Sequence, residues 1–161
     1  MADQTPSITV RVTEEDFDTS AELARLEALP GGAIASFTGL VRDDGGLTAL
    51  RLEHYPAMTQ AQISAVVQQA CARWPLLGVT VVHRFGELPV GARIVFVGTV
   101  SSHRVAALEA CAYLIDWLKV SAPFWKQEIR RDGSRGWVEA QNADDARAAL
   151  WRRREGRLDP I

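Results

Sequence analysis

Two lysines stand out in a chain whose positive charges are otherwise arginines. Lys119 and Lys126 lie seven residues apart in "LIDWLKVSAPFWKQE" (114–128), and the other 16 basic residues are arginines. An arginine keeps its proton in proteins, whereas a lysine amine near apolar groups or another cation loses it more readily and then acts as a base or nucleophile. The alternative is that chance left two lysines in an arginine-rich chain. If the two lysines take part in a reaction, they predict a site where an amine exchanges a proton.

A second polar group lies where a predicted strand runs into a helix. In "TVSSHRVAALEA" (99–110), two serines precede His103 and Arg104. The N-terminus of a helix presents unpaired N–H groups and a partial positive charge, so this arrangement predicts an anion site. Alternatively, Ser101 or Ser102 caps the helix while His103 and Arg104 face water. The sequence leaves both interpretations open.

Arg42 is a further candidate ligand. It follows an apolar run and precedes the acidic turn "DDGG", so a surface ion pair with Asp43 or Asp44 is the alternative. His54 and His83 lie in predicted strands beside apolar residues, and we interpret both as structural histidines.

The cysteines and the known binding motifs add no site. Cys71 and Cys111 lack metal-ligand spacing and are predicted to be reduced, buried and apolar in character. The chain has no zinc, P-loop or dinucleotide fingerprint, and we expect no metal.

Composition predicts one soluble domain spanning residues 1–161. The chain is 47% hydrophobic and 24% charged, with a net charge of −2, so no overall field attracts nucleic acid or an anionic membrane. We find no signal segment and no apolar run approaching about 18 residues, and we expect a cytoplasmic location without membrane contact. The basic "WRRREGR" (151–157) complements a helix C-terminus better than it predicts RNA binding.

Residue periodicity supplies the elements that position these groups. Predicted strands lie at 7–13, 32–42, 47–55, 78–86 and 92–102, with a closing hairpin formed by "FWKQEIR" and "GWVEA". The strands at 32–42 and 47–55 form a predicted hairpin around "DDGG". Because helices and strands do not alternate strictly, we predict an α+β fold with a mainly antiparallel sheet packed with helices.

Predicted helices cover 18–29, Pro56 to Trp74, His103 to about Lys119, and 143–154. In the second of these helices, the predicted buried face holds Ile63, Val66, Val67 and Ala70. The predicted buried face of the helix that ends at Lys119 consists of Ala107, Leu108, Cys111, Leu114, Ile115 and Leu118. At ~1.5 Å per residue, the two ends of that helix lie roughly 22 Å apart. One small ligand therefore cannot touch His103 and Lys119 of the same chain.

Several longer segments together resemble a known family. The segments "GAIASFTGLVRD", "LTALRLEHYPAMT", "RWPLLGVTVVHRFGEL", "VGARIVFVGTVSSHRVAALEAC", "LIDWLKVSAPFWKQE" and "WVEA" have the order and spacing of the catalytic, large subunits of molybdopterin synthase, the MoaE family. The resemblance covers roughly residues 30–142 and leaves a terminal helix and tail at 143–161. It implies a two-layer, α/β-hammerhead-like fold.

The resemblance also implies a function. Members convert cyclic pyranopterin monophosphate to molybdopterin by building a dithiolene. The sulfur comes from the thiocarboxylated C-terminus of a small ubiquitin-like partner subunit, so no cofactor in the protein is expected. Two large subunits form a homodimer within a heterotetramer.

Carried over position by position, the resemblance makes Lys119 and Lys126 catalytic. It makes Arg42, His103, Arg104, Phe37 and Glu128 substrate-binding. Leu40, Gln127 and Gln141 stand where many members have basic residues, which weakens any ligand role at those positions.

The helix length and the resemblance together predict shared sites in a twofold dimer. Lys119, Lys126 and Arg42 of one chain would face His103 and Arg104 of the other. The alternative functions are a non-catalytic phosphometabolite-binding module and, through the arginine-rich tail, an RNA-binding domain. The roles of the two lysines, the order of sulfur additions and any covalent lysine intermediate stay open.

Overall fold

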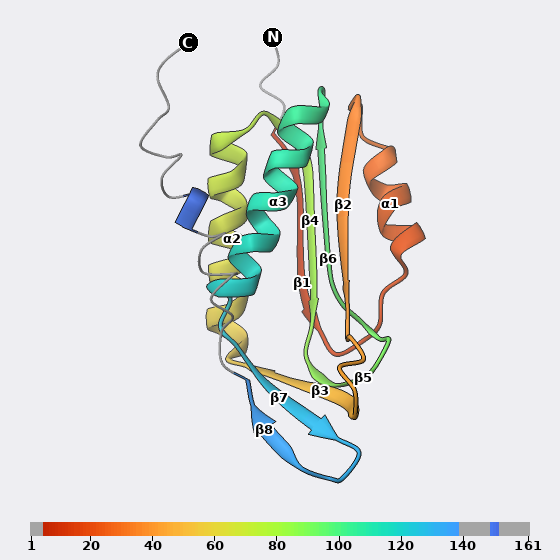
Figure 1. The fold of residues 1–161 in the computed structure, drawn as a ribbon. Coiled ribbons are helices and arrows are strands. Elements are labelled where there is room, and N and C mark those ends of the chain that lie inside the picture. The colour runs from red at the N-terminus through yellow and green to blue at the C-terminus, as the bar shows by residue number, and fades with distance from the viewer. Residues whose placement is uncertain (1–4, 139–148, 152–161) are drawn as a thin grey trace.

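The computed structural model describes residues 5–138 and 149–151, which form two β-sheets and three long helices (Figure 1). The elements in chain order are β1 Ser7–Thr13, α1 Thr19–Glu27, β2 Ala33–Leu40, β3 Leu47–His54, α2 Pro56–Arg73, β4 Leu76–Arg84, β5 Gly86–Pro89, β6 Arg93–Ser101, α3 Arg104–Val120, β7 Phe124–Arg130 and β8 Arg135–Trp137.

The first sheet has the strand order β1-β4-β6-β2. Only the β1–β4 pair in it is parallel. Helices α2 and α3 cover one face, and α1 covers the other (Figure 1). The second sheet, β5-β3-β7-β8, is antiparallel and lies across the lower end of the first. The predicted α+β class with mainly antiparallel pairing is therefore confirmed.

Local chemistry explains where the first two helices begin and end. The Asp18 side chain accepts hydrogen bonds from two backbone N–H groups at the start of α1. Pro56 occupies the first turn of α2, where its missing N–H has no intrahelical acceptor to lose. Helix α2 ends just before Pro75, which disfavours helical backbone in the residue that precedes it. The predicted buried face of α2 is confirmed, since Ile63, Val66, Val67 and Ala70 are all buried.

Both faces of the first sheet are buried, so its central strands are apolar nearly throughout. Along β4, Val79 and Val81 pack into the core under α2 and α3, whereas Val82 joins a smaller cluster under α1. Successive strand residues point to opposite faces. His83 therefore points to the same face as Val81.

The predicted hairpin of 32–42 with 47–55 is wrong. β2 pairs with β6, whereas β3 pairs with β5 and β7 in the other sheet. Gly45 and Gly46 both adopt positive φ angles, which glycine reaches without a steric cost, and their turn carries the chain from one sheet to the other. Alternating sequence patterns show that two strands exist but do not show which strands pair.

The closing hairpin is confirmed, because β7 and β8 pair through the turn containing Gly133. Between β4 and β6, where the sequence predicts only a connection, the structure has the short strand β5, which pairs with β3. A four-residue strand that ends in Pro89 is too short to produce a clear alternation.

The predicted helix ending near Lys119 is confirmed as α3, but two details differ. Leu108, placed on the predicted buried face, is 59% exposed and lies with exposed Val105 on the outer surface. Neither serine caps the helix: the N-cap is His103, without a side-chain cap bond, and Ser101 Oγ donates to the Pro75 carbonyl. Among the described residues, no helix is long and apolar enough to cross a membrane.

Most of the predicted terminal helix, 143–154, lies outside the described residues, but 149–151 are helical. Trp151 is buried there, and its Nε1 donates to Asp116 of α3. The Arg73 guanidinium lies 5.0, 5.2 and 5.7 Å from the ring centroids of Trp74, Tyr113 and Trp151. This aromatic cluster holds Trp151 against α2 and α3.

Candidate functional site

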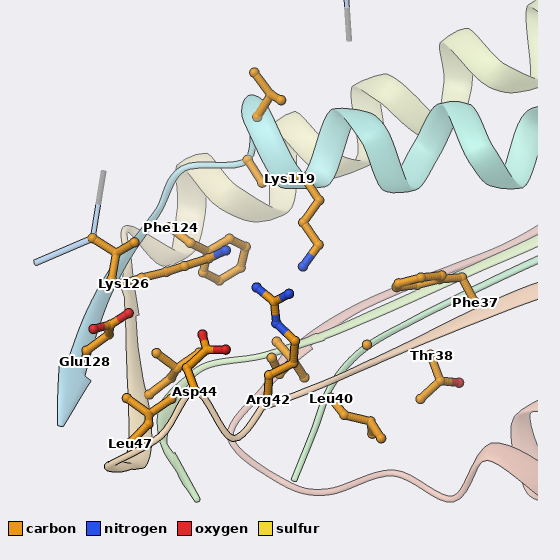
Figure 2. Close-up of a pocket in the computed structure, with 16 residues that line it drawn as sticks. Phe37, Thr38, Leu40, Arg42, Asp44, Leu47, Lys119, Phe124, Lys126 and Glu128 are labelled. Carbon is orange, nitrogen blue, oxygen red and sulfur yellow. The ribbon is translucent and has the colours of Figure 1, made fainter. Parts of the chain in front are cut away.

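A pocket of about 650 Å³ opens where the two sheets meet. The end of β2, the turn after it, the end of α3 and the strands of the second sheet form its walls (Figure 2). The residues that line it are Phe37, Thr38, Gly39, Leu40, Arg42, Asp44, Leu47, Leu50, Ile94, Lys119, Val120, Ala122, Phe124, Lys126, Glu128 and Val138.

The two lysines reach this pocket from different elements. Lys119 comes from the last turn of α3, whereas Lys126 comes from β7, half-buried beside Phe124. Arg42, just after β2, extends toward the Lys119 amine from the opposite wall (Figure 2). The fold therefore brings together the three cations that the sequence analysis named from separate segments.

Two carboxylates share the pocket with these cations. Glu128 lies on the same face of β7 as Lys126, and its carboxylate already accepts a hydrogen bond from Arg130. Asp44 comes from the turn after Arg42, yet no described residue forms an ion pair with Arg42, so the surface pairing weighed for Arg42 does not form. Among the described lining residues, three cations face two carboxylates, and Glu128 is already paired with Arg130, so this part of the lining suits an anionic ligand.

Apolar side chains form the rest of the lining. Phe37, predicted to bind substrate, is 38% exposed at one end of the pocket. Leu40 lines the same wall, so a residue that departs from the family pattern still contacts the cavity. Gln127 points to the other face of β7, and Gln141 lies outside the described residues.

The structure does not bring His103 and Arg104 to this pocket. Both are exposed at the opposite end of α3, a helix of 17 residues that begins at Arg104. At ~1.5 Å per residue, Arg104 lies roughly 22 Å from Lys119. The predicted site residues thus form two groups within one chain.

Two histidines lie behind the pocket wall. His83 is buried, and burial lowers its pKa to about 3. Its hydrogen bond to the Arg84 carbonyl raises the pKa, whereas the charges of Lys119 and Lys126 lower it further. Burial also lowers the pKa of His54. Both rings are therefore neutral near pH 7, as expected for structural histidines.

Phe124 and Asp44 are among the lining residues that sequence reasoning did not name as candidates. Phe124 lies in the quoted lysine motif and was considered only as an apolar neighbour. Asp44 was considered only as a partner for Arg42. Their positions in the pocket depend on contacts between sheets, for which the local sequence carries no signal.

The described lining of the pocket thus combines apolar side chains with two lysine amines and an arginine. A lining of this kind suits a small anionic molecule and contains groups able to exchange protons. Among the described residues, no three His, Cys, Asp or Glu side chains cluster as metal ligands. Fold and pocket together define an α+β protein with a pocket lined by two lysines and an arginine.

Comparison with known proteins gives the family. The model of the MoaE protein family matches residues 12–121. A molybdopterin synthase catalytic subunit from Mesorhizobium japonicum is 50% identical over 148 residues, covering 89% of this chain and 93% of that protein. One from Rhizobium meliloti is 48% identical over 151 residues, covering 91% and 97%. The solved structure of a molybdopterin biosynthesis MoaE protein from Burkholderia ambifaria has a TM-score of 0.77 at 44% identity, covering 89% and 97%.

The chain belongs to the MoaE protein family. The resemblance identified from the sequence motifs is confirmed. The match to the family model begins before residue 30 and ends before Lys126. The alignments to the two relatives cover 89% and 91% of the chain, so they run past residue 121 and include Lys126.

Proposed function

We propose that this chain is the catalytic, large subunit of a molybdopterin synthase. It transfers sulfur from the thiocarboxylated C-terminus of a small ubiquitin-like partner to cyclic pyranopterin monophosphate, forming the dithiolene of molybdopterin in the cytoplasm. The observation that carries the proposal is the convergence of the chain's two lysines with Arg42 in one pocket. The sulfur arrives on the partner, so the chain needs no cofactor of its own.

In this proposal, each cation has a chemical task. Arg42 keeps its charge and holds an anionic group of the pterin or the partner's tail. Lys119 and Lys126 supply amines that exchange protons with the reacting atoms, a task that a guanidinium cannot perform. Phe37 and Glu128 contact the substrate, Phe37 through its ring and Glu128 as a hydrogen-bond acceptor.

We further propose that each complete site takes His103 and Arg104 from a second copy of the chain. Strand β2 runs from the His103–Arg104 pair to the lysine pocket. Near the start of β2, Gly32 N donates a hydrogen bond to Ser101 O, and the other end of β2 lines the pocket. β2 is also one of the two outer strands of the first sheet, and exposed Ile34 and Leu40 lie along it.

Antiparallel pairing of two β2 edges would place the start of one strand beside the end of the other. Exposed Val105 and Leu108 of α3 would be covered in the same contact. A twofold dimer of this kind brings the His103–Arg104 pair of one copy toward the lysines of its partner. One small subunit at each pocket then completes a heterotetramer.

Mixing two inactive variants tests both parts of the proposal. Lys126→Ala and Arg104→Ala should each abolish dithiolene formation when the purified chain is supplied with thiocarboxylated partner and pterin substrate. Mixed dimers of the two contain one intact site, so we expect up to about a quarter to a half of wild-type activity to return. If mixed dimers form and no activity returns, the shared site is wrong.

The lysine chemistry has its own test. Lys119→Arg and Lys126→Arg keep the positive charge, and at least one should fail nearly as completely as its alanine variant. Full turnover by both arginine variants would rule out proton exchange at the amines. Substrate binding by the wild-type chain without any product would instead favour the phosphometabolite-binding module.

A further inference from the structure

His83 is a buried polar residue that the proposed reaction does not use, and it lies in a column of rings behind the pocket. Its imidazole stacks on Phe124 with a centroid separation of 3.9 Å and an interplanar angle of 15°. On the other side of the column, Phe124 lies 5.5 Å from His54, which lies 4.4 Å from Phe85. Two imidazoles and two phenyl rings thus pack together where the sheets meet.

This stack joins the two sheets beside the lysines. His83 belongs to β4 of the first sheet, whereas Phe124 is the first residue of β7 in the second. Phe124 lines the pocket and stands two residues before Lys126. A short turn at residues 121–123 joins α3 to β7, so the placement of Phe124 decides where β7 leaves that turn.

The remaining contacts of His83 fix its ring. Nδ1 lies 2.8 Å from the Arg84 carbonyl oxygen, which accepts only, so Nδ1 carries the proton. Neighbouring strands hold the backbone on both sides, with Val12 of β1 and Val95 of β6 in register. Burial lowers the pKa of His83 to about 3, so the ring stays neutral and adds no third cation behind the lysines. A phenylalanine here would keep the stack but leave the Arg84 carbonyl without this donor.

We propose that His83 is a positioning residue for the lysine pair: through its stack on Phe124, it fixes the start of β7 and thereby the place of Lys126 relative to Lys119. Its effect on turnover rests on the proposed function. Its effect on the lysines' surroundings does not, because that follows from the ring contact alone.

The chain offers a direct readout, since it contains two lysines and each gives one carbon signal when lysine is ¹³C-labelled at Cε alone. NMR spectra of the full chain would be recorded for wild type, His83→Leu and His83→Phe, with signals assigned from the Lys→Arg variants. His83→Leu keeps apolar volume without a flat ring, and His83→Phe keeps the ring. Val82→Ala is the matched control, because Val82 is equally buried on the same strand but packs under α1.

We expect His83→Leu to shift both lysine signals and lower kcat by at least ~10-fold, since displacements near 1 Å at a reacting group cost that much or more. His83→Phe should restore both measurements toward wild type. Val82→Ala should leave the lysine signals in place even if its melting temperature falls as far. If His83→Leu does not fold, Phe124→Leu breaks the same stack from the other side and should shift the Lys126 signal.

Two results would overturn the proposal. Unchanged lysine signals in a folded His83→Leu chain would show that the stack does not place the amines. Equal impairment in His83→Phe and His83→Leu would show that the imidazole nitrogens matter and the ring contact does not. If His83→Leu shifts the lysine signals while the wild-type chain itself forms no dithiolene, the positioning role is supported and the proposed function alone is contradicted.

Discussion

The buried imidazole of His83 should make the fold sensitive to mild acid. Its pKa is about 3 in the folded chain, against 6.5 for an ordinary histidine, because burial disfavours the charged ring. The groups that face it add to this effect, since the charges of Lys119, Lys126 and His54 all oppose protonation, and only the Arg84 carbonyl favours it. Acidification between pH 7 and 5 should therefore destabilise the folded chain.

The sign and size follow from proton linkage. Between the two pKa values, the unfolded chain binds a proton at residue 83 that the folded chain does not, so the free energy of unfolding falls as the pH falls. At pH 5, an ordinary histidine favours its protonated form by a factor of about 30, which corresponds to about 2 kcal/mol. At pH 7 an ordinary histidine is mostly neutral and this destabilisation is small, so nearly all of the loss in the free energy of unfolding occurs between pH 7 and 5.

Urea unfolding at pH 7, 6 and 5, at one fixed protein concentration, measures the effect. Wild type should lose about 2 kcal/mol more than His83→Phe over this range, because the variant has no titrating ring at that position. The variant keeps His54, whose lowered pKa acts in the same direction, so the difference isolates His83. Equal losses in the two proteins, within ~0.5 kcal/mol, would refute the burial of a neutral imidazole.

Other substitutions test the packing. Gly32→Ala would place a Cβ 2.4 Å from a backbone carbonyl oxygen and should cost about 1–3 kcal/mol in thermal unfolding, whereas Gly136→Ala, with nothing within 4 Å, should cost far less. Trp151→Ala removes a buried ring and its bond to Asp116, and urea unfolding should show a loss of about 3 kcal/mol if the C-terminal segment unfolds with the core. Burial raises the pKa of Cys111 to about 11, so a thiol reagent at pH 8 should react with it rapidly only after unfolding; equal rates in native and unfolded protein would contradict its burial.

The sequence predicted most elements because their signals are local. The alternation in 7–13, the proline that opens α2 and the apolar run in β6 each depend on a few neighbouring residues. Pairing between strands is not local, and this explains the wrong hairpin between 32–42 and 47–55. Leu108 was misplaced because α3 carries apolar residues on two faces, and periodicity alone does not tell a core face from an exposed one.

The candidate site was predicted to the extent that chemistry marked its residues. Lys119 and Lys126 stood out by type and Arg42 by its position before an acidic turn. The family pattern added Phe37 and Glu128, and all five residues line one pocket. Asp44 and Phe124 were missed because ordinary acidic turns and apolar motifs contain the same residue types. Their proximity to the lysines arises only when the two sheets meet.

The junction between the two sheets explains how lysines from two different elements come to share one pocket. Lys119 ends a helix that packs on the first sheet, whereas Lys126 belongs to the second sheet. An amine from each side faces one cavity only while the sheets keep their relative placement, and the stack of His83 on Phe124 is a direct contact between them at that point. A short turn at residues 121–123 connects the lysines, so it limits their separation but does not by itself direct both side chains to the same ligand. The pairing of the amines is therefore a property of the sheet junction, and substitutions behind the pocket wall should alter the lysines without touching a ligand.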